Sequence, residues 1–288
     1  MASTPSEGND STKLNKNRLI TVLAIEAGAT ATSVILLNNL WYKNYPCSGF
    51  RIFNDNSEWL QMDKFGHTSS SYGISCKCYY LLKWSGVKEN KALLYGGTMG
   101  FIYLTAIEML DGFSKEWGFS PGDEIANALG SSLFIGQQLL WKDQRLTLKW
   151  SFHHTSYSKY RPDLLGKNLA ENALKDYNGQ TYWLSINIKS FLSQESKFPA
   201  WLNIDLGYGA DGMLGGRSNP TAYEGNILPI FKRGRQFYLS PDLDLSRIKT
   251  KSVLLKTVFN FLGFLKFPMP AIEYNASGKK LKGYYLYF

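Results

Sequence analysis

The chain has 288 residues, enough for one large domain or two ordinary ones, and its composition is 44% apolar, 15% aromatic and 19% charged. The charged share is below the roughly 25% of typical soluble domains, and many aromatic rings with little charge favour a protein at a membrane boundary over a soluble aromatic-rich β domain. The net charge is +9, but no block of basic residues is interleaved with aromatics, which argues against a nucleic-acid-binding module.

Residues 1–17 are polar and are expected to be disordered. Residues 18–41 form an apolar segment about long enough to cross a bilayer as a helix, although Glu26 and three threonines make it a marginal membrane span. Glu26 within the apolar run and the long polar leader argue against a cleaved signal peptide. We therefore expect a retained helix over 18–41 that ends at an interfacial aromatic pair, Trp41 and Tyr42.

Three more helices are predicted before residue 142. They cover about 60–84, about 90–110 and 121–141. Gly96, Gly97 and Gly100 permit close contact between packed helices. Ser120 is expected to cap the last of these helices, with Pro121 as its first residue.

After residue 142 the apolar pattern changes to the alternation that is typical of strands. The alternating segments are 146–152, 182–188, 201–209, 237–245 and 284–288. The apolar run 254–265 fits either a helix or a strand. Asp242 and Asp244 alternate with leucines and are expected on one strand face, toward solvent or a lumen.

The predicted fold class is α+β. An apolar bundle of about four helices over 18–142 is followed by a strand-rich region over 143–288 that forms an antiparallel sheet or a small β-barrel. Several of the strands are shorter than the about 9–11 residues of a transmembrane strand.

Polar pairs occur on three consecutive predicted helices, and each pair is spaced to lie on one helix face. The pairs are Asp63 with His67, Glu108 with Asp111, and Asp123 with Asn127. Because isolated charges are costly in an apolar bundle, we expect the pairs to face one another and to form one site. Lys64 and Asn127 would lie at its edge, and Glu26 could contribute from the first helix.

Three interpretations of this site remain open. The pairs could form a structural polar network that caps and pins the helices. They could bind a divalent metal through His67, Glu108, Asp111 and Asp123. They could also perform acid–base catalysis through His67, Asp63, Glu108, Asp111 and Asp123.

The order of these motifs resembles a known family. The sequence resembles the YfiM-type family of predicted periplasmic lipoproteins of unknown function. The resemblance lies in the order of three motifs: DKxxH, Glu108 to Gly112, and WGFSxxD with a following Asn. The sequence is also similar to VanZ-like membrane proteins, which share the DKxxH helix. The matching positions, within about residues 60–140, are Asp63, Lys64, His67, Glu108, Asp111, Trp117, Ser120, Asp123, Asn127 and Gly130. The C-terminal extension is similar to that of long family members from Bacteroidetes-type bacteria.

The resemblance implies a Gram-negative envelope protein, at the outer membrane or the periplasmic face rather than the inner membrane, without an established activity. We predict a structural, binding or assembly component, with membrane lipid and other envelope proteins as candidate partners and no nucleic acid. The alternative is an envelope hydrolase, either metal-dependent or acid–base, that acts on a lipid or envelope substrate through His67, Glu108, Asp111 and Asp123.

Overall fold

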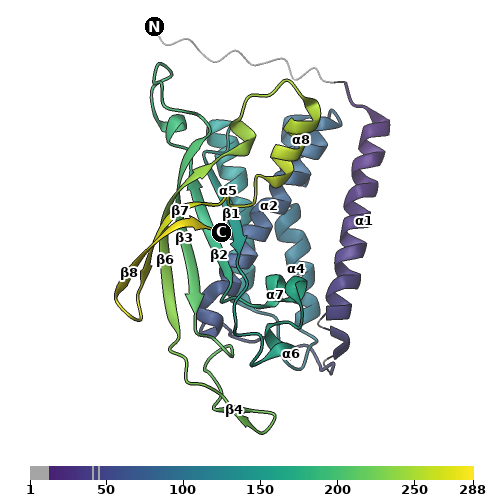
Figure 1. The fold of residues 1–288 in the computed structure, drawn as a ribbon. Helices are drawn as coiled ribbons and strands as arrows, with labels where there is room; N and C mark the ends of the chain where they lie inside the picture. Colours follow the sequence, from purple (N-terminus) through teal and green to yellow (C-terminus); the bar gives the residue numbers. More distant parts are fainter. Residues whose placement is uncertain (1–12, 41, 45) are drawn as a thin grey trace.

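The computed structural model describes residues 13–288 except 41 and 45. Helices make up 45% of the structure and strands 21%, and the main sheet is antiparallel, which confirms the mixed fold class. In Figure 1 the first five helices form one layer, and the sheet forms a second, curved layer beside them.

The first five helices form a bundle around α2. They are α1 (Lys16–Leu40), α2 (Met62–Trp84), α3 (Glu89–Tyr95), α4 (Met99–Asp111) and α5 (Pro121–Trp141). The prediction of about four helices is too low, because the expected third helix is interrupted at residues 96–98. Gly96 and Gly97 lie there, and glycine is a weak helix former.

The remaining helices are short and lie among the strands. They are the α-helices α6 (Pro162–Leu165), α7 (Leu169–Lys175) and α8 (Val253–Leu262), and the 3₁₀ turns Tyr42–Asn44, Glu58–Gln61, Ile188–Phe191 and Leu245–Arg247. The apolar run 254–265, which fitted either type of element, is therefore mostly helical.

Glycines bring the central helices unusually close. A Cβ atom on Gly100 of α4 would lie 2.0 Å from the Ser71 carbonyl oxygen of α2, and one on Gly130 of α5 would lie 2.2 Å from that of Thr68. Ser71 and Ser131 fill this contact with a 2.9 Å hydrogen bond between their hydroxyls. The expected close helix contact through Gly100 is confirmed.

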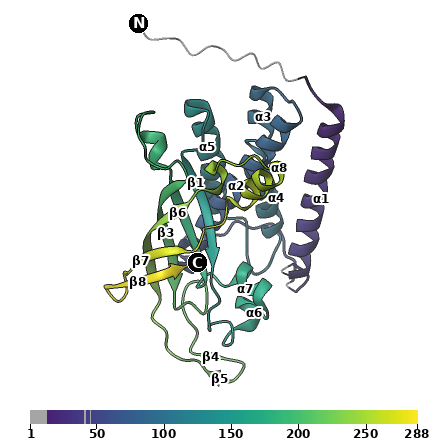
Figure 2. The same cartoon turned by 45° about the horizontal axis from the view of Figure 1, so that its top comes forward.

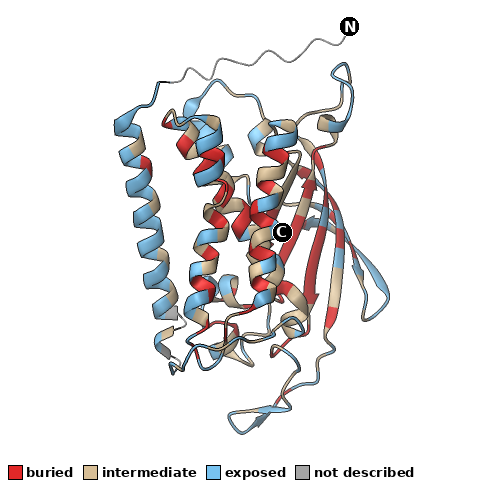
Figure 3. Ribbon diagram, turned by 180° about the vertical axis from the view of Figure 1, so that it is seen from behind, coloured by how far each residue is buried: buried red, intermediate tan, exposed pale blue. Residues whose placement is uncertain are grey.

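Helix α1 lies beside the bundle and most of its side chains are exposed (Figure 3). Val22 is buried against the bundle. Two segments are long and apolar enough to cross a membrane: Lys16–Asn39, whose most apolar stretch is 6% buried, and Glu89–Asp111, whose most apolar stretch is 39% buried. A signal sequence or a core helix can have the same composition, so composition alone does not decide between these roles. The predicted aromatic pair cannot be placed, because Trp41 lies outside the described residues.

The main sheet has six antiparallel strands in the order β1-β2-β3-β6-β7-β8. They are β1 (Leu146–Phe152), β2 (Gln180–Ile186), β3 (Leu202–Asp211), β6 (Gly234–Leu243), β7 (Met269–Asn275) and β8 (Lys280–Tyr287); β4 (Ala222–Tyr223) and β5 (Asn226–Ile227) form a separate small hairpin. Strands β7 and β8 project beyond the helical layer (Figures 1 and 2).

The sheet does not close into the β-barrel that the sequence left open as an alternative. Among the described residues, β1 and β8 form its two edges and are not paired with each other. Trp150 of β1 instead exchanges backbone hydrogen bonds with the chain after α8: its N–H donates to the Phe264 carbonyl at 2.8 Å, and its carbonyl accepts from Lys266 N–H at 2.9 Å. These bonds occupy the middle of the edge that a barrel would need.

The two faces of the sheet differ in polarity. Leu148 and Tyr182 pack toward α2, together with its residues Tyr72 and Met62, respectively. The opposite face carries fully buried polar side chains, and Asp242 is among them rather than in solvent. The segment after α8 covers this face and brings the Lys266 ammonium to 3.3 Å from Asp242 Oδ1.

Candidate functional site

The polar cluster lies at the end of the bundle where α2 begins, α4 ends and α5 begins. Three residues with positive φ angles, Trp59, Leu60 and Gln61, turn the chain sharply into α2. Asp63 and His67 then occupy the first two turns of this helix, one above the other. The tight entry therefore fixes where both side chains point.

Ser120 joins the other two helices. Its hydroxyl accepts a 3.1 Å hydrogen bond from Asp123 N–H, and Pro121 follows it as the first residue of α5, which confirms the predicted cap. The Ser120 N–H donates to Glu108 Oε2 at 2.9 Å. Its hydroxyl also donates to Asp55 Oδ1 at 2.6 Å. One residue thus orients the carboxylates of Glu108 and Asp55 and caps the helix that carries Asp123.

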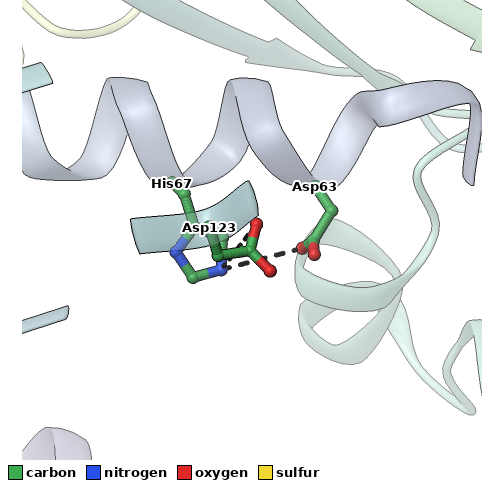
Figure 4. Close-up of side chains that lie close together, drawn as sticks. All are labelled: Asp63, His67 and Asp123. Atoms are coloured by element: carbon green, nitrogen blue, oxygen red, sulfur yellow. Dashed lines mark ion pairs between the residues drawn. The ribbon is translucent and has the colours of Figure 1, made fainter. Parts of the chain in front are cut away.

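His67 is the centre of the cluster (Figure 4). Its Nδ1 lies 2.9 Å from Asn127 Oδ1. The Asn127 amide nitrogen faces Glu124 Oε1 at 3.4 Å, so the amide oxygen points to the ring and Nδ1 carries a proton.

The other ring nitrogen of His67 faces only carboxylates among these contacts. Nε2 lies 3.6 Å from Glu108 Oε1, 3.9 Å from Asp123 Oδ1 and 4.0 Å from Asp63 Oδ1. A neutral ring would aim the Nε2 lone pair at three acidic groups, which is repulsive when all three are ionised. The position therefore favours a proton, on Nε2 or on a facing carboxyl group, or a bound cation.

Lys64 supplies a second positive charge. Its Nζ lies 2.7 Å from both Asp55 Oδ1 and Asp123 Oδ1, and 3.7 Å from Asp63 Oδ2. Four carboxylates, those of Asp55, Asp63, Glu108 and Asp123, thus surround two basic side chains. The cluster has more acidic groups than its own bases can neutralise.

The pKa values reflect this excess of acid. Burial raises the pKa of Glu108 to about 8 and that of Asp123 to about 7. Burial disfavours the charged form of His67, but the carboxylates of Asp63, Asp123 and Glu108 outweigh it, so the pKa of His67 is raised. The cluster therefore retains protons near neutral pH.

The structure brings together most, but not all, of the predicted residues. Asp63, His67, Glu108 and Asp123 meet as expected, with Asn127 and Lys64 in direct contact with them. Asp111 instead accepts a 2.8 Å hydrogen bond from the Tyr42 hydroxyl. Burial raises its pKa to about 6.

Glu26, which could have joined the cluster from the first helix, instead bonds to Cys78 in α2. Sequence reasoning also missed two contributors. Asp55 lies in a loop that has only turn residues as a signal, and Tyr177 lies 114 residues from Asp63, to which its hydroxyl donates. Local spacing contains no information about either contact.

Three of these side chains have the arrangement of metal ligands. One donor atom each from Asp63, His67 and Asp123 lies within 4.8 Å of the others. Asp63 is 28% exposed and His67 16%, whereas Asp123 and Glu108 are each 3% exposed. The cluster is thus buried on its α4 and α5 side and open to solvent at Asp63.

Residues 51–136 match a protein-family model described as predicted periplasmic lipoprotein (DUF2279). This match confirms the resemblance to the YfiM-type family of unknown function and the expected location at the periplasmic face of the envelope. The matched segment contains every acidic and basic residue of the cluster and ends before β1. No curated protein and no solved structure matches the chain.

Proposed function

We propose that the cluster binds one divalent metal ion in an envelope protein. Residues 51–136 of this protein, which contain the cluster, match a family of predicted periplasmic lipoproteins. The observation that carries this proposal is the His67 ring, whose Nδ1 is held by Asn127 while Nε2 faces three carboxylate oxygens. A ring held through one nitrogen presents the other in a fixed direction, as in protein metal sites.

The distances also suit a metal. Separations of 3.6, 3.9 and 4.0 Å between Nε2 and the oxygens are too long for hydrogen bonds. Neighbouring ligands in a tetrahedral site with bonds of about 2.0–2.2 Å are about 3.3–3.6 Å apart. The separation to Glu108 is at the upper end of this range, and those to Asp123 and Asp63 are slightly above it. His67, Asp63 and Asp123 would be the ligands, with Glu108 beside them. One imidazole with carboxylates suits zinc or another first-row divalent ion.

The surroundings support these roles. Tyr177 donates to the Asp63 carboxylate and would orient it toward the ion. Lys64 bridges Asp123 and Asp55, and it would shift toward Asp55 when an ion takes up the charge of Asp123. The metal would supply a positive charge beside Nε2 and the carboxylates, in place of a proton.

Acid–base hydrolysis of a lipid or envelope substrate is the second candidate function. The observation that favours it is the pairing of Glu108, with a pKa of about 8, and His67 at 3.6 Å. Two groups that exchange protons near neutral pH can act as acid and base. Asp63 and Asp123 would orient the ring, while Asp111, bound to Tyr42, would have no direct role.

The decisive experiment measures metal content and thermal stability of the detergent-purified wild type beside His67→Ala. Metal binding predicts one ion per chain in the wild type, a clear loss of the ion in the variant, and a rise in melting temperature on adding metal that only the wild type shows. His154→Ala is the matched control, because this exposed histidine lies far along the chain from the cluster.

Other results would assign the cluster a role other than metal binding. No metal in either protein, with a variant destabilised by about 1–3 kcal/mol, would make the cluster a structural network. The search for function would then turn to co-purifying envelope proteins. A metal-free wild type that loses a hydrolytic activity in His67→Ala, without loss of stability, would favour the acid–base enzyme.

A further inference from the structure

We propose that the end of the molecule opposite the His67 cluster docks on an anionic phospholipid surface, and that α8 enters the apolar layer there. This end, called the basic end below, consists of residues 13–18, 83–91, 141–145, 187–200 and 244–256. In Figure 1 it is the upper end, where α1 starts and α8 lies. This inference is independent of metal binding.

Side-chain and backbone contacts hold the five segments of the basic end together. The linking contacts are Asn15 N–H to the Ser85 carbonyl at 2.9 Å, Lys142 to Glu89 at 3.9 Å, Arg247 to Asp143 at 2.9 Å, and Asn187 N–H to the Arg145 carbonyl at 2.9 Å. Segments that are far apart in the sequence thus form one surface.

Nearly all of the net positive charge lies on this surface. The basic end carries 14 basic and four acidic residues, whereas the rest of the described chain carries 18 basic and 17 acidic residues. The lysines and arginines are scattered along the sequence. In the folded chain, those that are not matched by acidic residues lie together at one end. Such a concentration attracts an anionic surface over several ångströms and is screened by salt.

Helix α8 adds an exposed apolar face to the basic end. Leu254 is 73% exposed and Phe261 63%, and no residue of this helix is buried. Helical spacing places Lys256 and Asn260 on the other side from these two residues. An amphipathic helix normally packs its apolar face into the protein core; α8 turns this face outward.

These features together identify the partner as a bilayer. An amphipathic helix flanked by exposed lysines, here Lys249 and Lys251, is the pattern of helices that lie in a lipid interface. Nucleic acid would match the charge but not the apolar face. A second copy docked on the same face would bring two strongly basic surfaces together, which is repulsive.

The test is flotation of the full chain with preformed vesicles, after dilution of the detergent. Vesicles of phosphatidylcholine are compared with vesicles that also contain about 30 mol% phosphatidylglycerol. We expect binding to the anionic vesicles to be much stronger and to weaken as salt is raised. The triple variant Lys249→Glu, Lys251→Glu, Lys256→Glu should lower the partition coefficient by at least about 100-fold, because each lysine near the surface contributes roughly fivefold and each substitution also adds a negative charge.

The matched control reverses three exposed lysines elsewhere: Lys43→Glu, Lys115→Glu and Lys159→Glu. It makes the same change in net charge and should bind as the wild type does. A second variant, Leu254→Ser with Phe261→Ser, should weaken binding while leaving the salt dependence. Circular dichroism checks that every variant is folded.

Three outcomes would overturn the proposal. They are equal binding to both kinds of vesicle, equal loss in the two triple variants, and a lipid-independent dimer that the Leu254 and Phe261 substitutions dissociate. The last outcome would assign the α8 face to a second copy of the chain.

Discussion

Two buried clusters of charge, one in the helical layer and one in the sheet, differ in their balance. In the sheet, two lysines face two aspartates: Lys149 pairs with Asp242, and Lys266 lies 3.3 Å from Asp242 and 3.9 Å from Asp205. In the helical cluster, Lys64 and His67 face four carboxylates.

The clusters also differ in their access to solvent. The four charged side chains of the sheet cluster are at most 2% exposed. Their ammonium groups are further satisfied by carbonyls, at 3.0 Å from Lys149 to Leu243 and at 2.8 Å from Lys266 to Pro241. In the helical cluster, Asp63 is 28% exposed.

This difference separates a structural network from a binding site. The sheet cluster has as many bases as acids and is enclosed, and it holds β1, β3, β6 and the segment after α8 together. Both Asp205 oxygens lie in it without a hydrogen-bond partner among the described residues, with Lys266 3.9 Å away. An acidic set that is open to solvent acquires protons or a cation. Burial alone does not distinguish a structural network from a binding site. The ratio of acidic to basic side chains and the exposure of one side of the cluster to solvent distinguish them.

The largest expected effect comes from breaking the balanced cluster. Asp242→Asn leaves the Lys149 and Lys266 ammonium groups buried without a full counter-charge, so the free energy of unfolding should fall by about 3–5 kcal/mol. Denaturant unfolding followed by circular dichroism measures this change. Asp163→Asn, which breaks an exposed ion pair with Lys167, is the control and should have no resolvable effect. Equal stability of Asp242→Asn and the wild type would contradict the assigned structural role.

An intermediate effect is expected when the acid excess of the helical cluster is increased. Lys64→Met removes the ammonium 2.7 Å from Asp123, so the metal-free protein should lose about 1–3 kcal/mol of stability. The dissociation constant for a divalent metal should fall by roughly tenfold, because a competing positive charge is gone. Chelator competition measures the affinity, with Lys159→Met as the control. Weaker metal binding in Lys64→Met would argue against the proposed site.

The smallest expected effect is a pH dependence of the metal-free protein. The pKa values of Glu108 and Asp123 are raised by folding, to about 8 and about 7, and that of His67 is also raised. Groups with raised pKa values stabilise the fold at low pH, and this stability is lost as the pH rises through the folded-state values. The melting temperature should therefore be lower by roughly 2–8 °C at about pH 8.5 than at about pH 5.5.

Saturating metal should remove most of this dependence, because the ion replaces the protons. Thermal melts of the metal-free and metal-loaded wild type at both pH values provide the measurement. A melting temperature that rises between the two pH values in the metal-free protein would have the wrong sign for this account of the cluster.

Local spacing in the sequence predicted much of the helical cluster. The intervals between Asp63 and His67 and between Asp123 and Asn127 are those of one helix face, and these four residues do meet. The Ser120 cap and the bounds of α5 and β1 were likewise predictable, because caps and alternation are properties of neighbouring residues.

Sequence patterns could not reveal the sheet cluster. Nothing in the segments around Lys149 and Lys266 indicates burial, and Asp242 was expected to face solvent or a lumen. Only the crossing of the segment after α8 over β1 buries them together, through the backbone bonds of Trp150. The same crossing keeps the sheet from closing into a barrel.

The sequence by itself determined which helix faces are polar, where the strands alternate and that the whole chain is basic. The tertiary structure decided which carboxylates gather at His67: a loop brings Asp55, and Tyr42 holds Asp111 apart. It also decided that the lysines and arginines that are not matched by acidic residues lie together at the basic end, opposite the His67 cluster. The physical reason is distance along the chain. Periodicity reflects contacts within one helix or strand, whereas charge balance depends on pairs such as Lys149 and Asp242, which are 93 positions apart.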